Sequence, residues 1–256
     1  MEKLTIIKIG GGVLENQSEM LEFLDQFVAV EGNKVLVHGG GREATKLQDR
    51  LGIPAQMHEG RRITDAETLE IVTMVYGGLI NKRTVALLQS KKCNAIGLTG
   101  ADAGIVLAQK RPVKDIDYGF VGDVEKVNQD ALKKLIESGF VPIIAPLTFS
   151  REGYMLNTNA DTMASEIAIA LSKEYEVSLV FCFEKKGVLL DPKDEESVIS
   201  QINLNNYNEL KSKGIITAGM IPKLDNSFKA LEKGVKEIRI TSSQSLKDEN
   251  GTYLNL

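Results

Sequence analysis

Two runs of three consecutive glycines, each close behind a short apolar segment, constrain the fold of this chain more than any other feature. Leu4–Ile9 is a β-branched run that ends in Gly10–Gly12, and Val35–Val37 is a second apolar run followed by His38 and Gly39–Gly41. Helical patterns follow each glycine run. A strand, a glycine loop and a helix, repeated in immediate succession, are typical of a parallel sheet covered by helices. The sequence therefore predicts an α/β fold.

The rest of the chain continues this alternation of helices and strands. Helices are predicted over Met20–Val28, Arg42–Leu51, Asp65–Gln89, Ala131–Ser138, Met163–Leu171, Tyr207–Lys213 and Pro222–Lys233, and further strands over Ala95–Leu98, Val141–Ala145, Leu179–Phe183 and Glu237–Thr241, the last of the chain. Ile105–Val127 carries turn residues and predicts a hairpin insertion. A second cycle starts near Val177, so we expect an N-terminal lobe over 1–175 and a C-terminal lobe over 176–256.

The composition argues against several classes of protein. The 256 residues carry 31 Lys and Arg against 35 Asp and Glu, so binding of nucleic acid through bulk charge is not expected. No apolar run approaches the ~18–20 residues of a membrane span, and the first residues lack the features of a secretory signal. Cys93 and Cys182 have apolar neighbours and are expected to be reduced thiols of a cytoplasmic protein. The cysteines, His38 and His58 show no metal-ligand spacing.

The paired glycine loops indicate an anion site. Glycine lets backbone N–H groups approach a ligand closely, and a helix N-terminus behind such a loop favours a negative charge. A tight turn alone needs only one or two glycines. Gly39, Gly41 and Ala44 also fit the loose dinucleotide pattern G-x-G-x-x-A, so a nicotinamide-dependent oxidoreductase stays an alternative. Neither loop matches a P-loop.

Charged and amide side chains stand where such an anion would bind. Lys8 lies near the carboxyl end of a predicted strand, the edge at which ligands of α/β sheets bind. Lys223 lies at a predicted helix start, where a cation is disfavoured unless an anion is near. Arg62 can bind a carboxylate through two N–H groups, although the pair Arg61–Arg62 on its own is more typical of a solvated loop. Asn157–Asp161 alternates amides with a carboxylate, and in an extended segment Asn157, Asn159 and Asp161 would converge on one site. A helix-capping turn is the alternative, because Asn and Asp suit caps.

Five segments of this chain occur in the order seen in acetylglutamate kinases, and the chain resembles this family of the amino acid kinase superfamily over nearly its whole length. They are Ile7–Gly12, Val37–Gly41, Gly60–Thr64, Leu156–Asp161 and Ile216–Lys223. The resemblance implies a three-layer α/β/α sandwich around a mainly parallel central sheet. It also implies ATP-dependent phosphorylation of the γ-carboxylate of N-acetyl-L-glutamate, on the route to arginine or ornithine. The substrate would bind the N-terminal lobe and MgATP the C-terminal lobe.

The resemblance also implies roles for individual residues. Lys8 and Lys223 would stabilise the transferring phosphoryl group, and Asp161 would hold both lysines in place. The residues implied for the N-acyl-L-glutamate are Gly40, Gly41, Arg62, Asn157 and Asn159. Those implied for the nucleotide are Gly10, Gly11, Glu184, Lys185, Lys186, Gly187, Val188, Leu189, Ile215, Ile216 and Thr217. We further expect a homodimer that uses the long helix Asp65–Gln89.

Three departures from the family leave alternatives open. Phe183–Lys186 replaces a loop in which relatives often carry Ser/Thr-Asp. Arg61 replaces an apolar residue, and Arg42 is unusual after the second glycine loop. A guanidinium suits a second carboxylate, so N-succinyl-L-glutamate is an alternative substrate unless Arg61 and Arg42 lie in solvent or pair with Glu43 and Glu59. A non-catalytic amino-acid sensor on the same fold is a further alternative.

Overall fold

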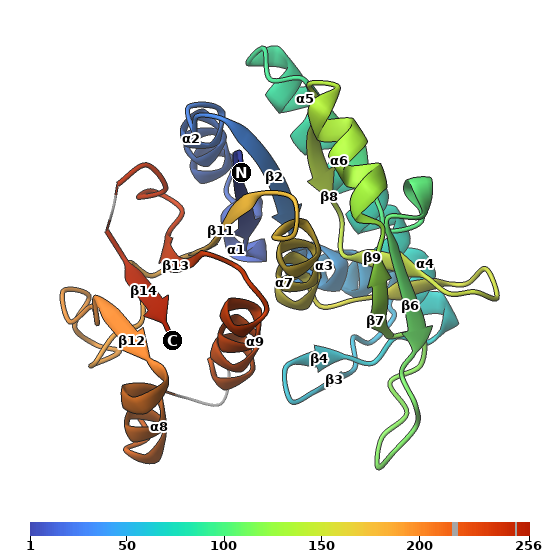
Figure 1. Ribbon diagram of the computed structural model, residues 1–256. Helices are drawn as coiled ribbons and strands as arrows, with labels where there is room; N and C mark the ends of the chain where they lie inside the picture. Colours follow the sequence, from blue (N-terminus) through green and yellow to red (C-terminus); the bar gives the residue numbers. More distant parts are fainter. Residues whose placement is uncertain (217–219, 249) are drawn as a thin grey trace.

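A parallel sheet with helices on both faces forms the centre of the molecule, as the glycine loops and the alternating elements predict (Figure 1). The computed structural model describes residues 1–216, 220–248 and 250–256. Within them, eight strands lie in the order β12-β14-β13-β11-β1-β2-β8-β5, and every neighbouring pair is parallel except β13 and β14. Their bounds are β1 Lys3–Ile9, β2 Asn33–His38, β5 Ala95–Leu98, β8 Val141–Ile144, β11 Glu176–Phe183, β12 Gln201–Asn203, β13 Glu237–Ser242 and β14 Thr252–Asn255.

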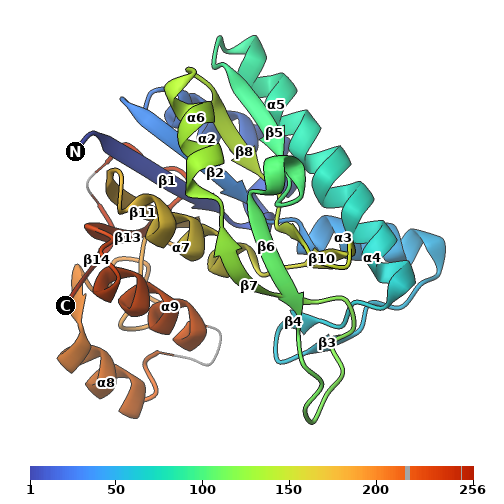
Figure 2. The ribbon, with the colours of Figure 1, turned by 45° about the vertical axis from the view of Figure 1, so that its right-hand side comes forward.

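The helices form two outer layers, which makes the three-layer α/β/α sandwich. One layer contains α1 Gly11–Glu15, α2 Gln17–Val28, α3 Gly41–Leu51, α4 Ala66–Val72, the π-helix η1 Thr73–Ile80 and α5 Asn81–Ser90. The other contains α6 Gln129–Glu137, α7 Ala160–Leu171, α8 Leu204–Ser212 and α9 Ile221–Glu232. In this second layer α7 and α9 pack side by side (Figure 2). The two layers bury separate apolar clusters on opposite faces of the sheet.

The alternation of side chains along β1 decides which layer each residue meets. Leu4 and Ile6 are buried in the cluster beneath α7 and α9, whereas Ile7 and Ile9 are buried in the cluster beneath α2. Successive side chains of a strand point to opposite faces. Lys8 therefore shares the face of Leu4 and Ile6 and points toward α7.

A smaller sheet stands beside the central one. It has the order β10-β9-β6-β7, with bounds β6 Val106–Lys110, β7 Gly122–Val127, β9 Leu147–Phe149 and β10 Met155–Asn157, and η2 Asp102–Gly104 precedes β6. The antiparallel pair β6 and β7 confirms the predicted hairpin. Two short strands, β3 Met57–His58 and β4 Arg61–Arg62, form a separate hairpin. An isolated bridge between Thr64 and Gly119 joins the residues after β4 to the loop before β7.

Most predicted elements are present, with three differences. The predicted helix Asp65–Gln89 is helical throughout but contains η1, whose eight residues are π-helical. Glu237–Thr241 is not the last strand, because β14 follows it and pairs with both β13 and β12. The continuous apolar run Val141–Ala145 predicts a central strand; it forms the largely buried strand β8, which lies second from an edge of the sheet. In the described part of the chain, none of the helices is long and apolar enough to cross a membrane.

Candidate active site

Two lysines and one aspartate from three distant segments meet at the carboxyl edge of the sheet. The Nζ atom of Lys8 on β1 lies 2.7 Å from Oδ1 of Asp161, and the Nζ atom of Lys223 lies 2.8 Å from Oδ2 of the same carboxylate. Asp161 stands in the first turn of α7, and Lys223 is the third residue of α9. Because α7 and α9 pack together over β1, the fold brings these charges to one place.

This cluster is largely removed from water. The side chains of both lysines are 9% exposed and that of Asp161 is 17% exposed. Phe183, the last residue of β11, lies under both ammonium groups, with ring-centroid distances of 5.2 Å to Lys8 and 3.4 Å to Lys223. A cation near an aromatic ring is stabilised by the ring quadrupole. The Phe183 ring therefore stabilises both ammonium groups, and because it carries no charge it does not neutralise them.

The pKa values follow from burial and mutual charge. Burial alone would raise the pKa of Asp161, but the positive charges of Lys8 and Lys223 outweigh it and hold this pKa at about 2. Burial lowers the pKa of Lys223 to about 8, an effect that Lys8 strengthens and Asp161 opposes. At neutral pH the three residues therefore carry one net positive charge, in a place where anions are attracted.

The two glycine loops lie against each other beside this cluster. The Gly10 N–H donates to the carbonyl of Cys182, and the Gly39 N–H donates to the carbonyl of Ile9. A Cβ atom on Gly11 would lie 3.7 Å from the nitrogen of Gly40, so the loops are in van der Waals contact. The backbone amides of both loops are thus gathered in one place, next to a positive charge.

The buried ring of His38 fixes the second loop. Its Nδ1 donates to the carbonyl of Gly39, and its Nε2 accepts from the side chain of Asn81. Burial lowers the pKa of His38 to about 4, so the ring is neutral at pH 7. Asn81 also donates to the carbonyl of Ile143. Both ring nitrogens are therefore used to hold the loop in place.

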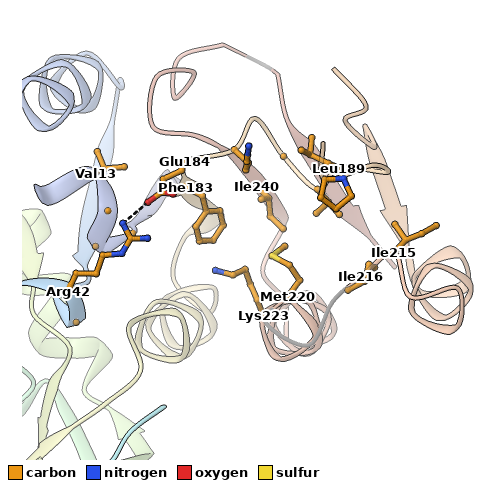
Figure 3. A pocket seen from close by; sticks show the side chains of 18 residues that line it. Val13, Arg42, Phe183, Glu184, Leu189, Ile215, Ile216, Met220, Lys223 and Ile240 are labelled. Atoms are coloured by element: carbon orange, nitrogen blue, oxygen red, sulfur yellow. Dashed lines mark hydrogen bonds and ion pairs between the residues drawn. The ribbon is translucent and has the colours of Figure 1, made fainter. Parts of the chain in front are cut away.

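A cavity of about 620 Å³ lies on the C-terminal side of the glycine loops (Figure 3). Of the residues predicted to bind the nucleotide, its lining includes Gly10, Gly11, Glu184, Lys185, Gly187, Val188, Leu189, Ile215 and Ile216. Lys186 does not line it, because its ammonium pairs with Glu196 and borders a different cavity. Thr217 lies outside the described residues. Lys223 also lines the cavity, so one catalytic candidate faces it directly.

A second cavity of about 240 Å³ lies on the N-terminal side and shares Gly11 and Gly41 with the first. Its lining includes all five residues predicted to bind the N-acyl-L-glutamate, namely Gly40, Gly41, Arg62, Asn157 and Asn159. The glycine loops therefore separate a large, mainly apolar cavity from a small polar one. A nucleotide requires the larger volume, and an amino-acid derivative fits the smaller.

Arg62 and the two asparagines are held by protein groups. The Arg62 side chain is buried and donates to Gln48, to the carbonyl of Gly41 at 2.8 Å and to Thr45 at 2.7 Å. The Asn157 side chain donates to Thr64 Oγ1 at 3.0 Å, and the Asn159 side chain caps α7. These contacts fix the polar wall of the smaller cavity.

Two sequence predictions about this region are wrong in detail. Asn157, Asn159 and Asp161 do not converge by alternation in an extended segment, because β10 ends at Asn157 and Asp161 is already in α7. The helical turn instead directs Asp161 to the lysines. Arg42 does not line the smaller cavity either. It lines the larger one and pairs there with Glu184, so the smaller cavity is formed without it.

Several site residues carried no sequence signal of their own. In the sequence, Phe183 stands out only as part of a departure from the family, and Tyr76, which limits the space at Gly40, belongs to an ordinary apolar stripe. A Cβ on Gly40 would lie 2.5 Å from the Tyr76 ring. Among the described residues, no group of three His, Cys, Asp or Glu side chains is placed to hold a metal ion.

Two lysines share one carboxylate beside the clustered glycine amides, and these amides stand between two cavities of an α/β sandwich. This arrangement is suited to move a phosphoryl group between two bound molecules. Fold and site together define the chain as an α/β phosphotransferase. The family model for the amino acid kinase family matches residues 3–242. The chain belongs to the amino acid kinase family and, within it, to the acetylglutamate kinases.

The similarity to individual relatives extends over nearly the whole chain. This chain is 56% identical to the acetylglutamate kinase of Bacteroides thetaiotaomicron over 99% of its own length and 98% of that protein. It is 60% identical to the acetylglutamate kinase of Cytophaga hutchinsonii, over 96% of this chain and 94% of the relative. Among solved structures, smu.665 from Streptococcus mutans superposes with a TM-score of 0.80 at 28% identity, covering 98% of each chain.

Proposed function

We propose that this protein transfers the γ-phosphoryl group of ATP to the γ-carboxylate of N-acetyl-L-glutamate in arginine biosynthesis. The product is N-acetyl-L-glutamyl 5-phosphate. The observation that carries the proposal is the cluster of Lys8, Asp161 and Lys223 at the glycine loops between two cavities of unequal size. The full-length relatives that bear the name acetylglutamate kinase support the choice of substrate.

The reaction requires that the protein align the two substrates and neutralise their negative charges. A γ-carboxylate has a pKa of about 4.3, so it is already an ionised nucleophile at pH 7 and needs no general base. The barrier comes from bringing two anions into line, and positive charge with oriented N–H groups lowers it. Lys8 and Lys223 supply the charge, and Gly11 and the second loop supply the N–H groups. Asp161 keeps the ammonium groups together without cancelling both.

The role of each cavity follows from its lining. The larger cavity would bind the adenine and ribose among apolar side chains such as Val188, Leu189 and Ile216, with the phosphates toward the glycine loops. In the smaller cavity, Arg62, Asn157 and Asn159 would face the N-acetyl-L-glutamate, with its γ-carboxylate toward Gly40 and Gly41. We accordingly propose lobes over 1–175 and 176–256, joined by a sheet that runs through both because β1 pairs with β11.

Mg²⁺ would enter with the nucleotide. This ion keeps most of its water and binds phosphate oxygens in kinases, so a full set of protein ligands is not required. The chemistry that Mg²⁺ supplies is neutralisation of phosphate charge.

A homodimer in the cytoplasm is the proposed state of the protein. Met74 and Leu79 on η1 are 56% and 53% exposed although both are large and apolar, and they lie on the predicted dimer helix. Light scattering should give twice the chain mass of 28.0 kDa. The double variant Met74→Glu, Leu79→Glu should be monomeric. A monomeric parent protein, or a variant that stays dimeric, would contradict this assignment.

The three alternatives explain less of the site. An oxidoreductase built on Gly39–Ala44 leaves the lysine cluster without a purpose. A sensor does not need two lysines with a shared carboxylate next to the glycine loops. The N-succinyl alternative loses Arg42, which lines the larger cavity, and retains Arg61, which is exposed and lines the smaller one.

A hydroxylamine trap tests the proposal directly, because hydroxylamine converts an acyl phosphate into a hydroxamate. With ATP, we expect hydroxamate from N-acetyl-L-glutamate, and less from N-succinyl-L-glutamate or free L-glutamate. The Lys8→Ala variant serves as the control for contaminating kinases. Absence of hydroxamate with the acetyl compound, or greater efficiency with the succinyl compound, would refute the proposed substrate.

A further inference from the structure

An ion pair spans the phosphate side of the larger cavity. Arg42 is the second residue of α3, and its Nη1 lies 2.9 Å from Oε1 of Glu184, the residue that follows β11. Both residues line the larger cavity together with the first glycine loop and Lys223 (Figure 3). Glu15 is a more distant partner, 3.9 Å from Nε of Arg42, and Lys46 already pairs with it at 2.9 Å.

The pair lies directly on the first glycine loop. A Cβ atom on Gly12 would lie 1.9 Å from Oε1 of Glu184 and 2.8 Å from Nη1 of Arg42. A nucleotide whose phosphates reach the loop amides therefore comes within contact distance of this guanidinium. Arg42 is thus placed at the position where the phosphates of a nucleotide would lie.

The ion pair is easily broken. The side chains of Arg42 and Glu184 are 61% and 56% exposed. Exposed ion pairs contribute little to stability, because water solvates the separated charges almost as well. Polyphosphate oxygens present several negative charges and suit the planar guanidinium fork better than one solvated carboxylate does. An incoming polyphosphate can therefore compete for Arg42.

We propose that Arg42 is a nucleotide-binding residue that leaves Glu184 and binds the terminal phosphates of ATP. The inference rests on the proposed function, because it assigns the nucleotide to the larger cavity. Glu184 holds the guanidinium over the loop while the site is empty. Arg42 adds a third cation to the two lysines that share Asp161.

Titration calorimetry with ATP, ADP and adenosine tests this role without relying on turnover. In the Arg42→Ala variant, we expect the Kd for ATP to rise at least ~10-fold, since a hydrogen-bonded charge is lost. The Kd for adenosine should stay the same, and the effect on ADP should be smaller than on ATP. Arg42→Lys should recover part of the loss, because it restores the charge but not the fork. Lys46→Ala is the matched control, an exposed cation on the same helix that does not line this cavity.

The Glu184→Gln variant tests whether Arg42 exchanges Glu184 for the phosphates of ATP or keeps its ion pair with Glu184 when ATP binds. Removing the competing carboxylate should leave ATP affinity unchanged or strengthen it up to ~5-fold. Weaker ATP binding in Glu184→Gln, equal loss of adenosine and ATP in Arg42→Ala, or unchanged ATP affinity in Arg42→Ala would each overturn the inference. Because ATP binding is measured directly, a protein that binds ATP but fails to phosphorylate N-acetyl-L-glutamate would refute the proposed function alone.

Discussion

Replacing Lys223 with Met should stabilise the folded protein while removing most of its activity. The ammonium group of Lys223 is largely buried, and its pKa falls from the usual 10.5 to about 8 because burial disfavours the charge. A difference of this size, at about 1.4 kcal/mol for each pKa unit, means that the charge costs the folded state about 3 kcal/mol. Met has a similar length and no charge. We therefore expect the free energy of unfolding at pH 7 to rise by about 1–3 kcal/mol.

The pH dependence of this gain is the sharper test. The folded pKa lies below the unfolded one, so between pH 8 and 10.5 the unfolded chain binds the proton more tightly. The cost of the charge is fully present below pH 8 and fades as the pH rises to 10.5. The stability gain of Lys223→Met should fade over the same interval in urea unfolding followed by circular dichroism.

A matched variant and the reaction rate complete the experiment. Lys229 lies on the same helix, half exposed, and pairs with Glu166 at 3.1 Å. Lys229→Met should change stability by less than about 1 kcal/mol. The kcat of Lys223→Met should fall by ~10²–10³, as when an oriented group of a transition-state site is lost. A Lys223→Met protein that is less stable than the parent at pH 7 would refute the electrostatic reasoning, and near-normal kcat would refute the catalytic role.

Three further expectations concern other parts of the site. Lys8→Ala should lower kcat by ~10²–10³ in the hydroxamate assay with a much smaller change in the Kd for ATP, and a purely binding defect would contradict its role. His38 has a folded pKa of about 4 against 6.5, so its contribution to stability is complete above pH 6.5 and is lost as the pH falls. Between pH 7 and pH 4 the parent should lose about 3 kcal/mol more unfolding free energy than His38→Gln, and equal losses would refute this. Gly40→Ala should raise the KM for N-acetyl-L-glutamate, because the added methyl meets the Tyr76 ring at 2.5 Å, whereas Gly78→Ala has open space and should behave like the parent. Unchanged KM in Gly40→Ala would count against the substrate site.

Local information determined the fold class and much of the site. The glycine runs after Leu4–Ile9 and Val35–Val37 predicted the parallel sheet, since only a few arrangements follow from a repeated strand, glycine loop and helix. The period of two along β1 also fixes the face on which Lys8 lies. The ordered family motifs implied the residues that line both cavities, although their roles remain predictions.

The sequence alone determined which chemical groups the site would contain, and the tertiary structure decided which of them meet. Lys223 and Asp161 lie 62 positions apart and Arg42 and Glu184 lie 142 apart, so no local pattern encodes these contacts. The packing of α7 against α9 placed the shared carboxylate between the lysines, where helical geometry rather than strand alternation aims Asp161. The neighbours of Arg42 along the chain left a contact with the acyl group as one alternative, but the approach of β11 to α3 gives it Glu184 as a partner in the larger cavity. Such pairings depend on which segments become neighbours when the helices pack on the two faces of the sheet. This packing is determined by the whole chain and not by any one segment.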